Sequence, residues 1–554
     1  MARSKKTRPR RSHTGRIVLL IAVLSVVVLC SAVLALAGRF GSERQPRLVT
    51  LSVAYSPEKR AVFEQLAQAF NEGGPRLPNG KRVQLVVASL TPEEMVEVAG
   101  DNTHQAISPD SSIWLAEIDR RWREDQGADV DLVGETTRYM ISPVVIAMWK
   151  DVAVTLGYPQ KELGWRDLLR VADENPSFKW SHPSTSTASG LLATLAEFYA
   201  GAGLTRGLTE EAATAKATTD YVARLERTVK HYGEGELAVM QRIEEEGQSF
   251  LDAFVVQEQM IVQHNARDNG QLVAIYPVEG TLWEDHPLAL LEHPQRTDEE
   301  RLAYQLLKEF VLSQGTQELV LRHGYRPTDL SIPLDHPDSP IRPDNGADPT
   351  KPYTTLQIPS PSVIAVVKNV WWYTKRHTNV YLVVDVSGSM EGRKLEDTRA
   401  ALHAFLGQIE GDLERVGLIT FSSRVSEVVP LVELGEGRDG LERAVDRLVA
   451  GGNTALLDGV DLALVKLVDL GDRERINALV VMTDGKENRS STALRTLTSK
   501  LPLASPPVVV FCIAYGRDAD YGMLESISGA SGGFTRRGEL ESIKDLYKTL
   551  STYF

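Results

Sequence analysis

Three short segments in the last third of the chain carry oxygen-bearing side chains at the ends of predicted regular elements. They read Asp385-Val386-Ser387-Gly388-Ser389, Gly451-Gly452-Asn453-Thr454 and Thr483-Asp484-Gly485. Alternate residues of an extended chain point the same way, so the first segment can aim three side chains at one point. Carboxylate and hydroxyl oxygens are the ligands that hard divalent cations prefer. The sequence therefore predicts a metal site with five candidate ligands: Asp385, Ser387, Ser389, Thr454 and Asp484.

The charge of this donor set indicates what such a site would do. Two carboxylates and three neutral hydroxyls only just neutralise a dication, so a further coordination position would bind an incoming carboxylate. Mg²⁺ is the expected ion, with Mn²⁺ or Ca²⁺ as alternatives, because the set offers no soft ligand. Such a site recognises a ligand and needs no proton transfer. Taken singly, each segment is also typical of an ordinary turn.

The predicted elements around these segments form an α/β domain of about 175 residues. Its strands are continuous apolar runs, which is typical of a parallel sheet covered by helices on both faces, and ligands bind such doubly wound sheets at the carboxyl edge. The predicted strands are Val380–Val384, Val416–Phe421, Ala478–Met482 and Val508–Ala514. The predicted helices are Lys394–Ile409, Gly440–Leu448, Leu456–Val468 and Glu539–Leu550.

Residues 378–554 resemble a von Willebrand factor A domain, a Rossmann-like fold. The pattern Asp-x-Ser-x-Ser, Thr, Asp of its metal-ion-dependent adhesion site (MIDAS) is present at all five positions. The resemblance implies that Ser387, Ser389 and Thr454 coordinate the ion directly, and that Asp385 and Asp484 act largely through water. It also implies a protein or other extracellular ligand with a carboxylate at the metal.

Residues 48–326 alternate strand and helix signals over a length that suggests two lobes. The predicted strands include Val49–Ala54, Val83–Ala88, Ser142–Trp149 and Leu272–Tyr276, and the predicted helices include Glu58–Asn71, Leu191–Ala200 and Asp298–Gly315. Hydroxyl-bearing turns precede several helices, where amides favour an oxyanion, although Ser and Thr are also common N-caps. The candidate cleft residues are Ser56, Ser111, Ser112, Ser184, Thr185 and Ser186.

This region resembles a two-lobed, periplasmic-type extracellular solute-binding protein. The resemblance rests on the first strand–helix unit Leu51–Asn71, on Ser142–Trp149, on Gly164-Trp165 before a helix, and on Ser181–Gly190. It implies a small polar or anionic solute between the lobes. Together the two regions resemble bacterial membrane-anchored proteins that fuse a solute-binding domain to a von Willebrand A domain.

Residues 327–377 join the two regions. Nine prolines between positions 327 and 361, with little hydrophobic periodicity, are typical of a loop or semi-rigid linker. Ser360-Pro361 then forms a helix start, and the helix that follows carries Val363, Val367 and Trp371 on one side. The sequence thus predicts a Pro-rich linker with a connecting helix.

The amino terminus has the pattern of a membrane anchor. Residues 1–16 carry seven basic side chains and no acidic one, and residues 17–37 carry no charge. These 21 residues, an apolar run broken only by Ser25, Cys30 and Ser31, span ~32 Å as a helix, enough for a bilayer core. The positive-inside rule then predicts a cytoplasmic tail over 1–16, a single span over 17–37 and an extracellular remainder at the cell membrane. A cleavable signal peptide is the alternative, and Ala35-Leu36-Ala37 fits its cleavage pattern.

The net charge and the absence of catalytic motifs limit the classes of function that the sequence supports. Once the seven positive charges of the tail are set aside, the net charge of −13 becomes −20, which argues against nucleic-acid binding. The sequence contains no phosphate loop, nucleophile elbow or His-Glu-x-x-His motif, so we expect no enzyme. We expect a membrane-anchored, adhesion-type binding protein that engages its ligand through the metal. The alternative is a solute-binding component of an ABC-type importer, with the A domain as a docking module.

Overall fold

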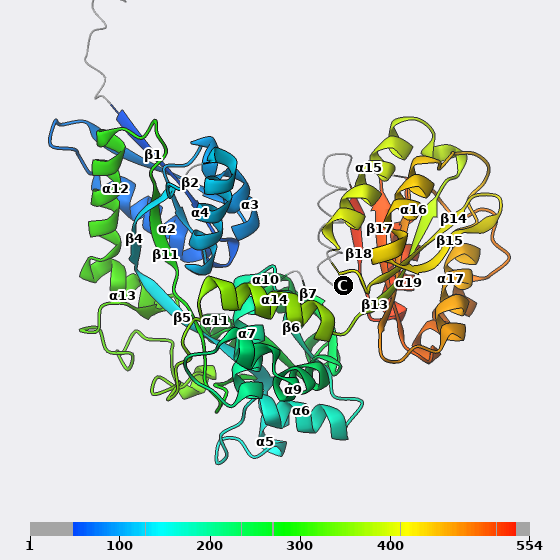
Figure 1. Ribbon diagram of the computed structural model, residues 1–554, viewed down its shortest axis with the longest axis horizontal. Helices are drawn as coiled ribbons and strands as arrows, with labels where there is room; N and C mark the ends of the chain where they lie inside the picture. Colours follow the sequence, from blue (N-terminus) through cyan, green and yellow to red (C-terminus); the bar gives the residue numbers. More distant parts are fainter. Residues whose placement is uncertain are drawn as a thin grey trace, which may run out of the picture.

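The computed structural model describes residues 48–538, except for residues 128, 234, 269–270, 410 and 517. Figure 1 shows three bodies: two lobes built from the first two thirds of the chain, and a separate α/β body. The predicted anchor and the predicted helix Glu539–Leu550 lie outside the described residues. Among the helices that are described, none is both long enough and apolar enough to span a bilayer.

The first lobe is built on a five-stranded sheet in the order β2-β1-β3-β11-β4. Its strands are β1 (Leu48–Tyr55), β2 (Arg82–Ser89), β3 (Ala106–Ser108), β4 (Val133–Arg138) and β11 (Pro287–Leu291). Its longer helices are α2 (Arg60–Gly73), α3 (Pro92–Val98), α4 (Ile113–Gln126), α12 (Asp298–Val311) and α13 (Gln314–Arg322). The sequence predicted a single helix over Asp298–Gly315; the structure instead ends α12 at Val311 and begins α13 at Gln314, with Ser313 as its N-cap.

The second lobe is built on a seven-stranded sheet in the order β10-β5-β8-β6-β7, with β9 and β12 also paired to β5. The strands are β5 (Met140–Trp149), β6 (Trp180–Pro183), β7 (Val229–Gly233), β8 (Ala253–Gln257), β9 (Leu272–Ile275), β10 (Trp283–Glu284) and β12 (Arg326–Pro327). The helices are α5 (Lys150–Thr155), α6 (Trp165–Glu174), α7 (Ala188–Ala202), α8 (Glu210–Thr214), α9 (Lys216–Glu226), α10 (Glu236–Glu246) and α11 (Glu258–Asp268). The chain crosses between the lobes from β4 to β5, from β10 to β11, and from α13 to β12.

The Pro-rich segment, predicted as a loop or semi-rigid linker, packs against the second lobe. Ile341 and Ala347 are buried in a small apolar cluster with Val262 of α11, and Leu356 lies in the main core of the lobe. The helix α14 (Pro361–Thr374) contributes Val367 and Trp371 to that same core. Proline removes backbone donors but does not prevent apolar side chains from packing, so composition alone suggested more freedom than the segment has.

The third body is a six-stranded sheet in the order β15-β14-β13-β16-β17-β18. Its strands are β13 (Thr378–Asp385), β14 (Arg415–Phe421), β15 (Val425–Glu433), β16 (Ile476–Thr483), β17 (Val508–Tyr515) and β18 (Thr535–Gly538). Its helices are α15 (Arg393–Gln408), α16 (Leu434–Asp446), α17 (Leu456–Leu470), α18 (Leu494–Lys500) and α19 (Tyr521–Ala530). All neighbouring strands pair in parallel except β15, an antiparallel edge strand that the sequence did not predict.

Apolar side chains cover both faces of this sheet, as continuous apolar strands require. Leu382 and Val384 face α15 and α16 in one core, whereas Val383 faces α17 and α19 in the other. Because β13 and β16 pair in parallel, their carboxyl ends lie side by side. The two predicted aspartates stand there, Asp385 as the last residue of β13 and Asp484 directly after β16.

Buried polar contacts join the second lobe to the third body. The ammonium of Lys375, which follows α14, lies 2.8 Å from an oxygen of Glu414, and both side chains are fully buried. Tyr232 and Trp372 flank that ammonium with their rings at 5.5 and 4.7 Å. Arg242 of α10 also donates to the carbonyl oxygen of Gly532 at 3.0 Å. The junction is therefore a packed interface.

Candidate metal site and interlobe cleft

Backbone and hydroxyl donors hold Asp385 in place at the carboxyl edge of the third sheet. The Ser387 amide donates to its Oδ1 at 2.8 Å, and the Thr483 hydroxyl donates to its Oδ2 at 2.5 Å. Burial raises the pKa of Asp385, the nearby Asp484 adds to that effect, and the bonds from Ser387 and Thr483 oppose it. The carboxylate is thus costly to keep charged without a cation nearby.

The remaining predicted ligands gather beside Asp385. Ser387 Oγ lies 3.0 Å from Ser389 Oγ, and Ser389 donates to Oδ1 of Asp484 at 2.6 Å. A Cβ placed on Gly485 would lie 3.3 Å from Thr454 Oγ1, 3.4 Å from Ser389 Oγ and 3.8 Å from Asp385 Oδ2. Oxygens from three separate segments therefore surround one small space, which a glycine keeps open.

Several residues that the sequence analysis did not single out support this arrangement. The Thr454 amide donates to the side-chain oxygen of Asn488 at 3.0 Å, and the Leu457 amide donates to Glu487 at 3.1 Å. Lys394, on the first turn of α15, contacts Oδ2 of Asp484 with its ammonium. Thr483, whose hydroxyl donates to Asp385, directly precedes the predicted ligand Asp484 in the sequence. That position could have identified it as part of the site. Asn488 and Glu487 lie in a loop that carries no readable pattern.

The donor chemistry fits a hard divalent cation. The set consists of carboxylate and hydroxyl oxygens; Asp385, Ser387, Thr454 and Asp484 are buried, and Ser389 is exposed. An ammonium already accompanies one of the two carboxylates, which shows that the edge accommodates positive charge. When bound, a dication would supply positive charge at an exposed edge of the sheet, where a ligand carboxylate could reach it.

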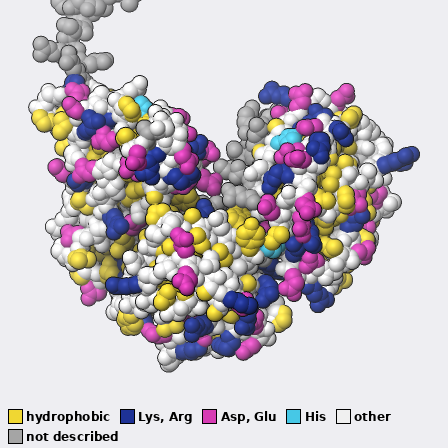
Figure 2. Space-filling view, viewed as in Figure 1, with side chains coloured by type: hydrophobic (Ala, Val, Ile, Leu, Met, Phe, Trp, Pro, Cys, Tyr) yellow, Lys and Arg dark blue, Asp and Glu magenta, His cyan; other side chains and the backbone are white. Residues whose placement is uncertain are grey.

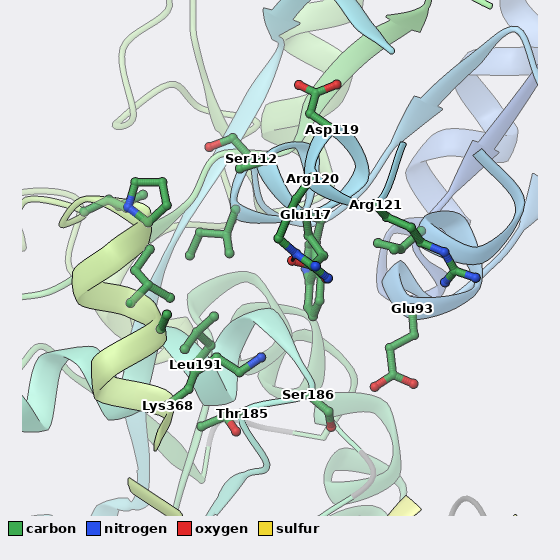
Figure 3. A pocket seen from close by; sticks show the side chains of 18 of the residues that line it. Glu93, Ser112, Glu117, Asp119, Arg120, Arg121, Thr185, Ser186, Leu191 and Lys368 are labelled. Atoms are coloured by element: carbon green, nitrogen blue, oxygen red, sulfur yellow. Dashed lines mark hydrogen bonds and ion pairs between the residues drawn. The ribbon is translucent and has the colours of Figure 1, made fainter. Parts of the chain in front are cut away.

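A second candidate site lies between the two lobes, in a groove of about 870 Å³. In Figure 3, Ser112 and Arg120 of the α4 region stand across from Thr185, Ser186 and Lys368. Ser184 also lines the groove, so four of the six predicted cleft residues meet there. The other two, Ser56 and Ser111, are fully buried, and Ser56 donates to the carbonyl oxygen of Ser108 at 3.3 Å.

The groove is lined by four acidic and four basic side chains, so its lining is not dominated by positive charge: Glu93, Glu97, Glu117, Asp119, Arg120, Arg121, Arg123 and Lys368. The Ser112 amide, a predicted anion donor, already donates to Oδ1 of Asp285 at 2.7 Å. Figure 2 shows acidic and basic side chains interspersed over the visible face, without a continuous basic surface. At the start of α4, the Ser112 amide is therefore already occupied by the carboxylate of Asp285.

Family models match both of the regions that the sequence analysis distinguished. A family model for bacterial extracellular solute-binding proteins matches residues 51–326, and the model for von Willebrand factor type A domains matches residues 379–549. The chain thus joins a solute-binding domain to a von Willebrand factor A domain. This confirms the resemblance that the sequence motifs indicated.

Individual relatives match parts of the chain. Inter-alpha-trypsin inhibitor heavy chain H4 of Sus scrofa is 29% identical over 170 residues, which are 29% of this chain and 18% of that protein. The chain covers only 18–20% of the inter-alpha-trypsin inhibitor heavy chains that it matches. The solved structure of the sulfate-binding protein SubI from Mycobacterium tuberculosis is 19% identical, covers 53% of this chain and 91% of its own, and has a TM-score of 0.37. A von Willebrand factor type A structure from Catenulispora acidiphila is also 19% identical, covers 32% of this chain and 42% of its own, and has a TM-score of 0.29.

Proposed function

We propose that the A domain binds a hard divalent cation and engages a carboxylate-bearing protein partner through it. The observation that supports this most is the convergence of Thr454, Ser389 and Asp385 oxygens around Gly485. Ser387, Ser389 and Thr454 would hold the ion, and Asp385 and Asp484 would balance its charge. Mg²⁺ is the ion we expect, because it combines well with carboxylates, hydroxyls and retained waters.

The chain as a whole is then a surface binding protein and not an enzyme. We propose that residues 17–37 anchor it in the cell membrane, with residues 1–16 in the cytoplasm and both domains outside. The seven basic residues before the apolar run support this orientation. Protease added to intact cells should degrade both domains; a protected carboxyl terminus would contradict the proposal. A mature amino terminus at Gly38 would show cleavage instead of anchoring.

Partner binding can be tested with the full chain and two matched substitutions. Asp385→Ala removes a proposed ligand, whereas Asp469→Ala removes an exposed aspartate of α17. Capture of a surface partner should require Mg²⁺, should be lost in chelator and with Asp385→Ala, and should persist with Asp469→Ala. Capture that is unchanged in chelator would contradict a metal-dependent interface.

A second candidate function is solute capture by the first domain for an importer, with the A domain docking it to other proteins. The groove of about 870 Å³ between the lobes favours this role, because its volume suits a small solute. Solute binding should then persist in chelator. The two functions are compatible, since the groove and the metal site lie in different domains.

A further inference from the structure

Four acidic side chains near the junction of the two lobes interact electrostatically with one another. Glu58 and Asp110 come from the first lobe, Glu236 begins α10 of the second lobe, and Glu284 ends β10 beside a lobe crossing. Burial, followed by repulsion from Glu58, raises the pKa of Asp110 to about 8 and that of Glu236 to about 8. Burial and the other three carboxylates raise the pKa of Glu284 well above its usual range. These four residues, here called the acidic cluster, therefore influence one another's pKa values.

Positive charge within this region is small by comparison. Lys59 is buried and close enough to interact with Glu58, Asp110 and Glu284, but its ammonium donates to Ser108 Oγ at 3.1 Å and to the Pro109 carbonyl at 2.7 Å. Arg138 is mostly exposed and pairs with Asp285 at 2.7 Å. Lys59 is thus a single ammonium that interacts with three members of the cluster and with Asp285.

Several acceptor atoms of the region have no partner among the described residues. They are both carboxylate oxygens of Glu284, which is fully buried, Glu58 Oε1, Asp110 Oδ1 and His286 Nδ1. A buried polar atom without a partner costs free energy, so the set calls for a ligand with several donors.

The histidine supports the same conclusion. Gln257 donates its side-chain amide to Glu236 at 2.8 Å, so its oxygen is left to accept from His286 Nε2 at 2.9 Å. Burial and the charge of Lys59 hold the pKa of His286 well below its usual range, so the ring is neutral and Nδ1 is an acceptor. His286 also packs edge-on against Tyr325, whose buried hydroxyl lacks a partner among the described side chains.

We propose that the acidic cluster binds a small organic cation with at least two ammonium groups. An ammonium offers three donors to unpartnered acceptors, and its positive charge is attracted to carboxyl groups that come from both lobes. A three-ligand metal site fits less well. Among the described residues, the one trio of such side chains with ligand atoms within 4.8 Å is His182, Glu197 and Glu226, which includes no member of the cluster. The inference rests on the solute-binding role of the first domain.

The groove comes close to the cluster, although none of the four acidic residues lines it. Ser112 lines the groove, and its amide binds Asp285, the neighbour of Glu284. Asp110 immediately precedes the Ser111-Ser112 turn, and its carbonyl accepts from the His286 amide at 2.9 Å. The groove and the cluster therefore adjoin along the same short segments.

Calorimetric titration of the full chain with 1,4-diaminobutane, in chelator, tests the proposal. We expect saturable binding of the diamine and at least tenfold weaker binding of 1-aminobutane. Sulfate, and Mg²⁺ in a titration without chelator, should not compete with the diamine. Glu284→Gln removes, at nearly constant shape, a carboxyl group that would ionise to pair with an ammonium, and it should weaken diamine binding at least tenfold. Glu309→Gln, an exposed glutamate of α12, should leave it unchanged.

Glu58→Gln provides a second test if Glu284→Gln fails to fold, because Glu58 Oε1 is also unpartnered. It should weaken the diamine at least tenfold while the chain unfolds at an unchanged or higher temperature. Binding of sulfate in place of the diamine would overturn the cation and leave the solute-binding role intact. No binding of the diamine by the wild-type chain, or equal binding by the folded Glu284→Gln variant, would also overturn the proposal.

Discussion

The ammonium of Lys394 contacts Asp484, the aspartate that follows β16. The Lys394 side chain is about one third exposed, whereas the Asp484 carboxylate is fully buried. Ser389 donates to the other oxygen of this carboxylate at 2.6 Å. The contact means that one of the two aspartates at the proposed metal site already has a cationic partner from the chain itself. A dication at this edge would therefore lie close to a like charge.

We predict that Lys394→Met tightens divalent-metal binding. Removing a neighbouring positive charge reduces repulsion of the ion, and we expect about a tenfold lower Kd, or ~1.4 kcal/mol. Titration of the full chain with Mg²⁺ measures this directly. Lys500→Met changes the same charge on α18, where the lysine pairs with Asp461, and should leave the Kd unchanged. Weaker binding by Lys394→Met would show that the lysine positions Asp484 instead of competing with the ion.

We predict that Gly485→Ala weakens metal binding with little loss of stability. The added methyl group would lie 3.3–3.8 Å from the oxygens of Thr454, Ser389 and Asp385, within the space that the ion would use. We expect at least a tenfold higher Kd for Mg²⁺. Gly529→Ala serves as control, because nothing lies within 4 Å of the corresponding Cβ. Equal metal affinity in both variants would place the ion elsewhere.

The sheet of the A domain could be predicted from the sequence because its strands are apolar on both faces. All eight residues of β13 and of β16 are buried, and the two aspartates at their ends were found from that pattern. The strand β15 was not predicted, because it contains Pro430 and its residues are alternately exposed and half-buried on an edge. Asn488 was not found either, since a loop residue that supports a ligand has no periodic signal.

The junction between the domains should make stability depend on acidic pH. Burial alone would raise the pKa of Glu414, but Lys375, His377 and Thr378 lower it to about 2. The group is ionised when folded and has an ordinary pKa of ~4.3 when unfolded. Its contribution is therefore fully present above pH ~4.3 and is lost as pH falls toward 2, by ~3 kcal/mol at most.

Glu414→Gln tests this dependence. The variant should be less stable than wild type at pH 7, because it leaves the buried Lys375 without its ionic partner, and the difference should shrink between pH 4.3 and 2. Chemical unfolding of both proteins across that range provides the measurement. A stability difference that does not change with pH would contradict the assigned linkage.

The Pro-rich segment should contribute to the stability of the second lobe. Leu356 is 3% exposed within the lobe core, so we expect Leu356→Ala to destabilise that lobe by ~2–4 kcal/mol. Leu330→Ala, at a leucine that is 94% exposed, should change stability by less than ~0.5 kcal/mol. Urea unfolding followed by tryptophan fluorescence separates the two cases. Equal stability of the two variants would show that the packing of this segment does not stabilise the lobe.

The acidic cluster shows where prediction from the sequence alone ends. Glu58, Asp110, Glu236 and Glu284 lie in four separate segments, and none of them belongs to a motif. The serine turns nearby were read as an anion site because helix starts favour anions, yet Asp285 already occupies the amide at Ser112. Only the arrangement of the lobes shows that carboxylates dominate this region.

Metal binding at the carboxyl edge of the A domain is the central claim, and thermal unfolding of the full chain with Mg²⁺ and with chelator tests it most directly. At one hundred times the Kd, the ion should stabilise the domain by ~2.7 kcal/mol. Asp385→Ala should lose most of this shift, and Asp469→Ala should retain it. The same unfolding temperature for the wild-type chain in Mg²⁺, Mn²⁺, Ca²⁺ and chelator would contradict the claim.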